Sequence, residues 1–174
     1  MARKSKLSLR QFQESVVAKL QAISQGGELK SASKLGMQVG AQYWLVDLAD
    51  VGEVVPPPEI VQVPLTQPWF AGATNVRGNL YSVVDFSAFC GGEPVAAGAD
   101  SRLILANAKF NVNSGLLVSR LLGLRHPDQL QPRDISAAAP PWVAAEYTDA
   151  DGHHWQELNF QALINDPGFL QAGR

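Results

Sequence analysis

Few residues in this 174-residue chain could hold a metal ion. The segment Asp149-Ala150-Asp151-Gly152 is similar to the start of a calcium loop, but its glycine is fourth rather than sixth. Phe160 also stands at the twelfth position, where such a loop needs a glutamate ligand. His153 and His154 are adjacent, so on a strand they point to opposite faces, and His126 has no ligand spacing to either. The sequence therefore predicts a hairpin turn at 149–152, with no metal and no cofactor.

The residues that could act as nucleophiles or acid–base groups also lack the usual partners. Cys90 is the only cysteine, has no basic residue beside it, and excludes an internal disulfide. The glycine-rich stretch 91–98 is not followed by the Lys-Ser/Thr of a phosphate loop. Asp85 ends an apolar strand and could serve catalysis together with a histidine. Backbone N–H groups or an arginine across the turn are the partners we expect for it, which makes Asp85 structural. We predict a protein that is not an enzyme.

The composition and charge of the chain limit the kinds of partner that it can be expected to bind. The chain is 46% hydrophobic and only 17% charged, which indicates either a mildly polar surface or a surface covered by a partner. The net charge of −2 gives no attraction to nucleic acid. Residues 1–34 hold seven basic and two acidic residues, a net +5, whereas residues 35–174 hold seven and fourteen, a net −7. We therefore divide the chain into a basic extension, 1–34, and a main domain, 35–174.

The basic extension contains a predicted helix over residues 8–24. Ser8 and Gln11 form a capping box, and Gly26-Gly27 ends the helix. One face is an apolar stripe, made by Leu9, Phe12, Val16, Leu20 and Ile23. This stripe must be buried by the chain's own domain, by a partner helix or by an anionic membrane surface that contacts residues 1–30. No apolar stretch follows the basic N-terminus, so we expect a cytoplasmic protein without a transmembrane segment.

The main domain is predicted to be all-β. Short segments rich in β-branched and aromatic residues alternate with turn signals, and Arg77-Gly78-Asn79 is typical of a hairpin tip in which Gly78 and Asn79 tolerate positive φ. A short helix over 160–170 closes the chain. This pattern favours β-barrels or a sandwich and disfavours a parallel α/β fold. Pro64 and Pro68 place the short predicted strand 59–65 at an edge or turn. The predicted strands cover residues 42–48, 51–55, 59–65, 72–76, 80–86, 102–108, 114–124, 142–148 and 153–160.

Residues 68–86 resemble the signature region of the CheW-like chemotaxis adaptor family, and the wider resemblance covers about 35–165. Upstream, Val51-Gly52-Glu53-Val54 is similar to a family strand, whereas Ser82 and Ser119 depart from the family pattern. The basic N-terminal helix and the ending from Asn159 to Leu170 resemble the pilus-associated version of the family. The signature stretches are Pro68-Trp69-Phe70-Ala71-Gly72, Asn75-Val76-Arg77-Gly78 and Ser82-Val83-Val84-Asp85-Phe86.

The resemblance implies a fold and a role. The fold would be two small five-stranded SH3-like β-barrels around a shared core, with the N-terminal amphipathic helix and the short C-terminal helix at the ends. The role would be a non-catalytic adaptor that couples the cytoplasmic hairpin tip of a chemoreceptor to the regulatory domain of a CheA-type histidine kinase. The pilus-associated version implies twitching motility through type IV pili and a place at membrane-associated receptor arrays.

The resemblance also implies a partner-binding site at the hairpin tip. Asn75, Arg77 and Gly78 would lie at or near the receptor-facing surface, with Arg77 as an anchor and with Val76 and Leu80 supplying apolar contact. The kinase-facing surface is not assigned to residues. Two alternatives remain open: an unrelated β-barrel that binds a ligand or serves a structural role, and a small enzyme that uses Asp85 with a histidine.

Overall fold

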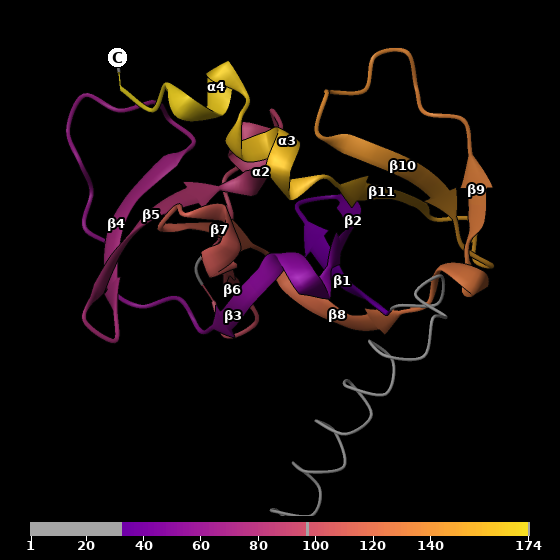
Figure 1. The fold of residues 1–174 in the computed structure, drawn as a ribbon, viewed down its shortest axis with the longest axis horizontal. Coiled ribbons are helices and arrows are strands. Elements are labelled where there is room, and N and C mark those ends of the chain that lie inside the picture. The colour runs from indigo at the N-terminus through magenta and orange to yellow at the C-terminus, as the bar shows by residue number, and fades with distance from the viewer. Residues whose placement is uncertain (1–32, 97, 174) are drawn as a thin grey trace, which may run out of the picture. The chain divides into compact units, whose positions relative to one another are not determined.

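The computed structural model describes residues 33–96 and 98–173 (Figure 1). The predicted helix over 8–24 and nearly all of the basic extension lie outside these residues. The described residues belong to one compact unit, Ser33–Arg174. They form two β-sheets, one of six strands and one of five. The all-β prediction is thus confirmed, although one sheet has six strands rather than the five expected.

The six-stranded sheet combines both ends of the described chain. The parallel pairing of β2 with β11 joins the first hairpin to the last one, and it aligns Tyr43 with Trp155. The sixth strand is β9, which has only three residues and pairs with β10. In spatial order the strands are β8 (Arg120–Arg125), β1 (Lys34–Val39), β2 (Gln42–Asp47), β11 (His154–Leu158), β10 (Val143–Thr148) and β9 (Gln131–Arg133).

The five-stranded sheet contains the signature region. Its strands β4 and β5 form a hairpin, and β5 pairs in parallel with β7. Strands β3 and β4 are the first and last in the spatial order. The order is β3 (Val51–Val55), β6 (Arg102–Ala106), β7 (Ser114–Val118), β5 (Asn79–Asp85) and β4 (Phe70–Val76).

Short helices connect or follow the strands. The α-helices are α2 (Phe86–Phe89), α3 (Phe160–Ile164) and α4 (Pro167–Leu170), and the 3-10 turns are η2 (Leu48–Asp50), η3 (Ala108–Phe110) and η4 (Pro127–Gln129). The predicted closing helix is present but divided into α3 and α4. Asp166 begins α4 by accepting hydrogen bonds from the N–H groups of Gly168 and Phe169. Among the described residues, no helix is long and apolar enough to cross a membrane.

Two predicted strands differ from the structure. The segment 114–124 is not one strand, because β7 belongs to the five-stranded sheet and β8 to the six-stranded sheet. Ser119 lies at this change of sheet, and its N–H donates to the carbonyl of Gln38. Residues 59–65 do not form a strand either. Only Val61 forms an isolated bridge, to Ala73 on β4, because the neighbouring prolines have no N–H groups for a ladder.

One apolar core joins the two sheets. It contains Met37 and Trp44 from the six-stranded sheet and Ile104 and Leu116 from the five-stranded sheet, all fully or almost fully buried. Because side chains alternate along a strand, the next residue of β7, Leu117, faces away and joins a smaller cluster inside the five-stranded unit. The expected shared core of two β-units is therefore confirmed.

Candidate functional site

The tip of the β4–β5 hairpin is a two-residue turn. Val76 pairs with Asn79, so the central residues are Arg77, with φ of +52°, and Gly78, with φ of +85°. Positive φ at both positions is the requirement of a type I′ turn. The sequence predicts that Gly78 and Asn79 accommodate positive φ, which is wrong for Asn79 because this residue belongs to the strand ladder. The side-chain oxygen of Asn75 accepts the Gly78 N–H at 2.9 Å and fixes the turn.

The guanidinium of Arg77 lies outside the turn and forms an ion pair. Its Nη2 atom is 2.6 Å from the Oε1 atom of Glu53 on β3, while 76% of the Arg77 side chain stays exposed. Glu53 and Arg77 belong to opposite ends of the spatial order of the five-stranded sheet. The sheet must therefore curve strongly for this contact to form, as a small barrel does. An exposed pair of this kind adds about 1 kcal/mol or less to stability.

A groove lies beside the hairpin, and we call it the edge groove. It has a volume of about 590 Å³ and is lined by Pro58, Glu59, Val61, Ala73, Thr74, Asn75 and Leu80. Its apolar residues are unusually open, since Leu80 is 66% and Val61 64% exposed. Of the predicted partner-binding residues, Asn75 and Leu80 line the groove and Arg77 lies at the hairpin tip. Val76 instead packs against the smaller core cluster.

Pro58, Glu59 and Val61 form the outer wall of the edge groove, and close contacts hold this wall against β4. The Thr74 hydroxyl donates to the Glu59 carbonyl at 2.7 Å, and Val61 and Ala73 exchange two backbone hydrogen bonds. Gly72 has a φ of +140°, and a Cβ atom there would lie 2.2 Å from the Val61 carbonyl oxygen. The glycine of the signature is therefore required for this segment to approach the strand.

Asp85 has a different environment from the hairpin tip. It is 6% exposed, and its two carboxylate oxygens accept the N–H groups of Ala88, at 3.0 Å, and Val95, at 2.7 Å. It thereby begins α2 and ties the following loop to the strand end. The structure does not pair it with Arg77, which contacts Glu53 instead.

Two histidines have carboxylate partners on the six-stranded sheet. The Nδ1 atom of His153 is 3.1 Å from Asp149, and the Nε2 atom of His154 is 3.0 Å from the buried Glu146. Asp85 belongs to the five-stranded sheet, so neither histidine contact supports acid–base work by Asp85. Burial raises the pKa of Cys90 to about 12, which keeps this residue a thiol.

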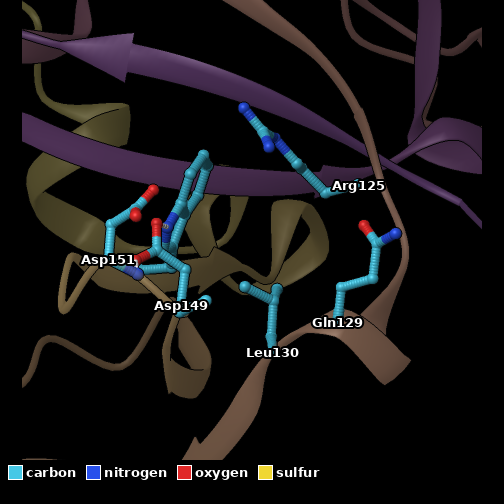
Figure 2. Close-up of a pocket in the computed structure, with 7 residues that line it drawn as sticks. Arg125, Gln129, Leu130, Asp149 and Asp151 are labelled. Atoms are coloured by element: carbon cyan, nitrogen blue, oxygen red, sulfur yellow. Dashed lines mark hydrogen bonds between the residues drawn. The ribbon is translucent and has the colours of Figure 1, made fainter.

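The turn at 149–152 borders a pocket of about 200 Å³ (Figure 2). Asp149 and Asp151 lie on one side of it, and Arg125 and Gln129 lie on the other. Ligand atoms of Asp149, Asp151 and His153 lie within 4.8 Å of one another. Asp149 already accepts the N–H groups of Asp151 and His153 and that of the Trp155 indole, each at 2.9 Å. These bonds hold the turn in place, so the carboxylate has a structural role in the hairpin turn that the sequence predicts at 149–152.

The electrostatics of Asp149 follow from the same bonds. Its partial burial acts to raise the pKa, but the hydrogen bonds from the Trp155 indole and from His153 outweigh this effect and lower the pKa to about 2. Glu146 is similar, because burial acts against ionisation while hydrogen bonds from Ser136 and the contact with His154 hold its pKa below the usual value. Both carboxylates are therefore anions whose acceptor sites are used inside the domain.

Comparison with known proteins identifies the family. A family model described as the CheW-like domain matches residues 34–168, most of the chain. The chain belongs to the CheW-like family. The matched range includes both sheets, the hairpin tip and the edge groove, so the family assignment covers the whole candidate site.

Two relatives of this CheW-like chain add detail. Protein PilI of Pseudomonas aeruginosa is 28% identical over 150 residues, which are 83% of this chain and 82% of PilI. This match supports the resemblance to the pilus-associated version of the family. The crystal structure of the scaffolding protein TtCheW from Thermoanaerobacter tengcongensis has a TM-score of 0.66 and 20% identity, over 79% of this chain and 95% of TtCheW. TtCheW therefore shows the same fold.

Part of the candidate site of this CheW-like chain is not apparent from the sequence. Glu53 lies in a strand that resembles the family, but nothing in the spacing connects it with Arg77, 24 positions later. The outer wall of the edge groove is predicted only in part, because Glu59–Leu65 was expected to be a short strand that Pro64 and Pro68 place at an edge or turn, and it forms only an isolated bridge at Val61. The proline-rich composition of 56–64 is the signal that such a segment lies along an edge instead of entering a sheet.

Proposed function

We propose that this chain is a non-catalytic adaptor of a chemosensory pathway that controls type IV pilus twitching motility. It would couple the cytoplasmic hairpin tip of a chemoreceptor to the regulatory domain of a CheA-type histidine kinase, in the cytoplasm at membrane-associated receptor arrays. The observation that carries the proposal is membership of the CheW-like family over residues 34–168. The similarity to PilI supports the link to pili.

The receptor-facing site in this proposal consists of the hairpin tip and the edge groove. The guanidinium of Arg77 is exposed but held by Glu53, so a partner meets it in a fixed position at little further entropic cost. The adjacent Leu80 and Val61 offer apolar surface that is open in the free protein. A fixed arginine beside exposed aliphatic side chains is the combination found at binding hot spots.

Titration calorimetry of the purified chain against the kinase regulatory domain and a receptor hairpin fragment tests the adaptor role. We expect saturable one-to-one binding to each, and a ternary complex that elutes as one peak in size exclusion. A folded chain that gives no heat and no co-elution with the kinase domain would remove the bridging function. The family fold would then serve a different role.

A charge-swap series tests the receptor-facing site. We expect Arg77→Glu to weaken receptor binding by more than tenfold while kinase binding is unchanged. The double variant Arg77→Glu with Glu53→Arg restores an ion pair with its direction reversed. If the receptor contacts the Arg77 guanidinium, the double variant stays weak. If receptor binding recovers, Arg77 acts only by holding the barrel closed, and the direct contact is disproved.

The basic extension, residues 1–34, belongs to the proposal as a separate segment from the domain of residues 35–174. We propose that residues 1–30 contact an anionic membrane surface, because their charge and their apolar stripe suit one. A peptide of residues 1–30 should bind vesicles of anionic lipid at low salt and be released at high salt. Absence of binding at low salt would end this part of the proposal, and neutral vesicles provide the control.

A further inference from the structure

The C-terminal segment of residues 166–173 crosses from one sheet to the other. It follows β11 of the six-stranded sheet through α3, whose apolar residues are buried in the shared core. It then runs beside the loop that precedes β4 of the five-stranded sheet, where Thr66 forms an isolated bridge with Gly173 (Figure 1). Its contacts therefore fall on residues next to the candidate site, although none of the residues 166–173 lines the edge groove.

The first attachment of this segment, which we call the C-terminal strap, is aromatic. The Phe169 ring stacks on Trp69 of the signature, with ring centroids 6.3 Å apart and ring planes 12° apart. It also meets Phe89 edge-on, with centroids 5.6 Å apart, and Trp69 and Phe89 contact each other in the same way at 5.0 Å. Aromatic pairs in these geometries are favourable beyond the area that they bury. Phe169 thereby fixes the residue that immediately precedes β4.

The second attachment is made by the backbone. Beyond α4, the Gln67 N–H donates to the Ala172 carbonyl at 2.7 Å. Gln67 lies at the end of the same segment whose beginning forms the outer wall of the edge groove. The C-terminal strap therefore holds one end of this segment, and β4 holds the other end through the two backbone hydrogen bonds between Val61 and Ala73.

Between these two attachments the backbone is strained. Leu65 has a φ of +60°, a left-handed conformation that is unfavourable for a residue with a Cβ atom. Its side chain is 80% exposed, so packing does not compensate for the strain. A strained residue persists only where the surrounding structure fixes the chain on both sides. If the strap loosened, Leu65 would relax toward negative φ, and the change would reach Val61, four positions earlier.

We propose that the C-terminal strap positions the outer wall of the edge groove, with Phe169 as the positioning residue. The strap fixes the residues before β4, the strained backbone at Leu65 passes this restraint along the segment, and Val61 takes a fixed place beside Ala73. The groove is thus formed before a partner arrives, which lowers the entropic cost of binding. The restraint on the wall does not depend on the adaptor role, whereas its effect on receptor binding rests on the proposed function.

Hydrogen exchange of the full chain, followed by NMR, tests the restraint without any partner. Phe169→Ala should reduce the protection of the Val61 and Ala73 amides about fivefold, because the hydrogen bonds between these residues open more often. Leu170→Ala is the matched control on the same helix, since Leu170 is 66% exposed, and it should change the protection less than about twofold. Unchanged protection in Phe169→Ala, or an equal loss in the central strands β6 and β7, would overturn the proposal.

A rescue variant separates positioning from simple packing of the ring. Asparagine tolerates the left-handed conformation better than leucine does, so Leu65→Asn makes the wall less dependent on the strap. Adding Leu65→Asn to Phe169→Ala should restore about half of the lost protection at Val61. A ring that only stabilises the domain would give no such recovery. Absence of recovery would show that strain at Leu65 does not connect the strap to the wall.

Receptor binding of the same variants tests the functional consequence. Phe169→Ala should bind the receptor hairpin fragment about threefold more weakly than the unchanged chain, and Leu170→Ala should bind it equally well. If the unchanged chain does not bind the fragment, the proposed function fails, while the exchange result still decides the role of the strap. If Phe169→Ala loses protection but binds the fragment as tightly as before, the strap does not serve this site.

Discussion

The β4–β5 and β10–β11 hairpin turns of the described domain use their polar residues in opposite ways. At the β4–β5 tip, the turn is held by Asn75 and by backbone geometry, so the Arg77 guanidinium stays outside and 76% exposed. At the β10–β11 turn, the Asp149 carboxylate accepts hydrogen bonds from two backbone N–H groups and from the Trp155 indole. A polar group whose hydrogen bonds are all made within its own turn stabilises that turn. A polar group that extends outside the turn is available to a partner.

The largest expected effect comes from removing the organising carboxylate. Asp149→Ala leaves two backbone N–H groups and the indole N–H of Trp155 without their acceptor, and Trp155 is almost fully buried. We expect a loss of about 3 kcal/mol in the free energy of unfolding, measured by urea denaturation. The receptor binding proposed for the hairpin tip on the other sheet should be unchanged in the fraction that remains folded.

The neighbouring Asp151→Ala is the matched control for this variant. Asp151 is exposed, and only its backbone N–H bonds to Asp149, so its side chain should contribute less than about 0.5 kcal/mol. Equal destabilisation by the two variants would contradict the view that one carboxylate organises this turn. It would indicate instead that general negative charge in the loop is what matters.

The sequence predicts both turns but not this difference between them. Glycine and small polar residues between β-branched segments identify a hairpin, because positive φ and short loops restrict the residue types that fit. Segments rich in β-branched and aromatic residues likewise predict most strands, whereas the shared core is implied only by the resemblance to the CheW-like family. Which donors converge on Asp149 depends on the position of Trp155 across the hairpin, and this is a property of the folded strands and not of residue spacing.

The Arg77–Glu53 ion pair and the edge groove depend even more on the folded structure, and residue spacing does not predict them. Glu53 lies on β3 and Arg77 lies in the turn that follows β4, the strand at the other end of the sheet order, so only the curvature of the whole sheet brings them together. The segment near Val61 follows β4 through two hydrogen bonds, which local propensity does not encode. The signature residues could therefore be found by resemblance, whereas the surface they form required the tertiary structure.

The next largest effect is the pH dependence of the stability that Asp149 contributes, and it tests the structural role of the β10–β11 turn directly. The pKa of Asp149 is about 2 in the folded domain, below its ordinary value of 3.8, so the unfolded chain takes up the proton first as the pH falls. The stabilisation from this carboxylate is complete above about pH 5, where the unfolded chain is also ionised, and is lost as the pH falls from there toward 2. We expect the difference in unfolding free energy between the unchanged chain and Asp149→Asn to shrink between pH 5 and pH 2.

Comparing the two proteins at each pH removes the contributions of other carboxylates. Glu146 also has a lowered pKa, but it is present in both chains and cancels from the difference. Urea denaturation at intervals of half a pH unit is sufficient. A difference that stays constant from pH 5 to pH 2 would show that the Asp149 carboxylate is not preferentially ionised in the folded state.

The smallest effect on stability is expected at the hairpin tip. Arg77→Ala removes an exposed ion pair with Glu53 but leaves the Asn75–Gly78 hydrogen bond that fixes the turn. We expect the free energy of unfolding to change by less than about 1 kcal/mol. Asn75→Ala, which removes that bond and leaves Arg77 in place, is the matched variant on the same hairpin. If Arg77→Ala unfolds the domain as readily as Asp149→Ala does, the guanidinium is a structural element like that carboxylate, and the contrast between the two turns fails.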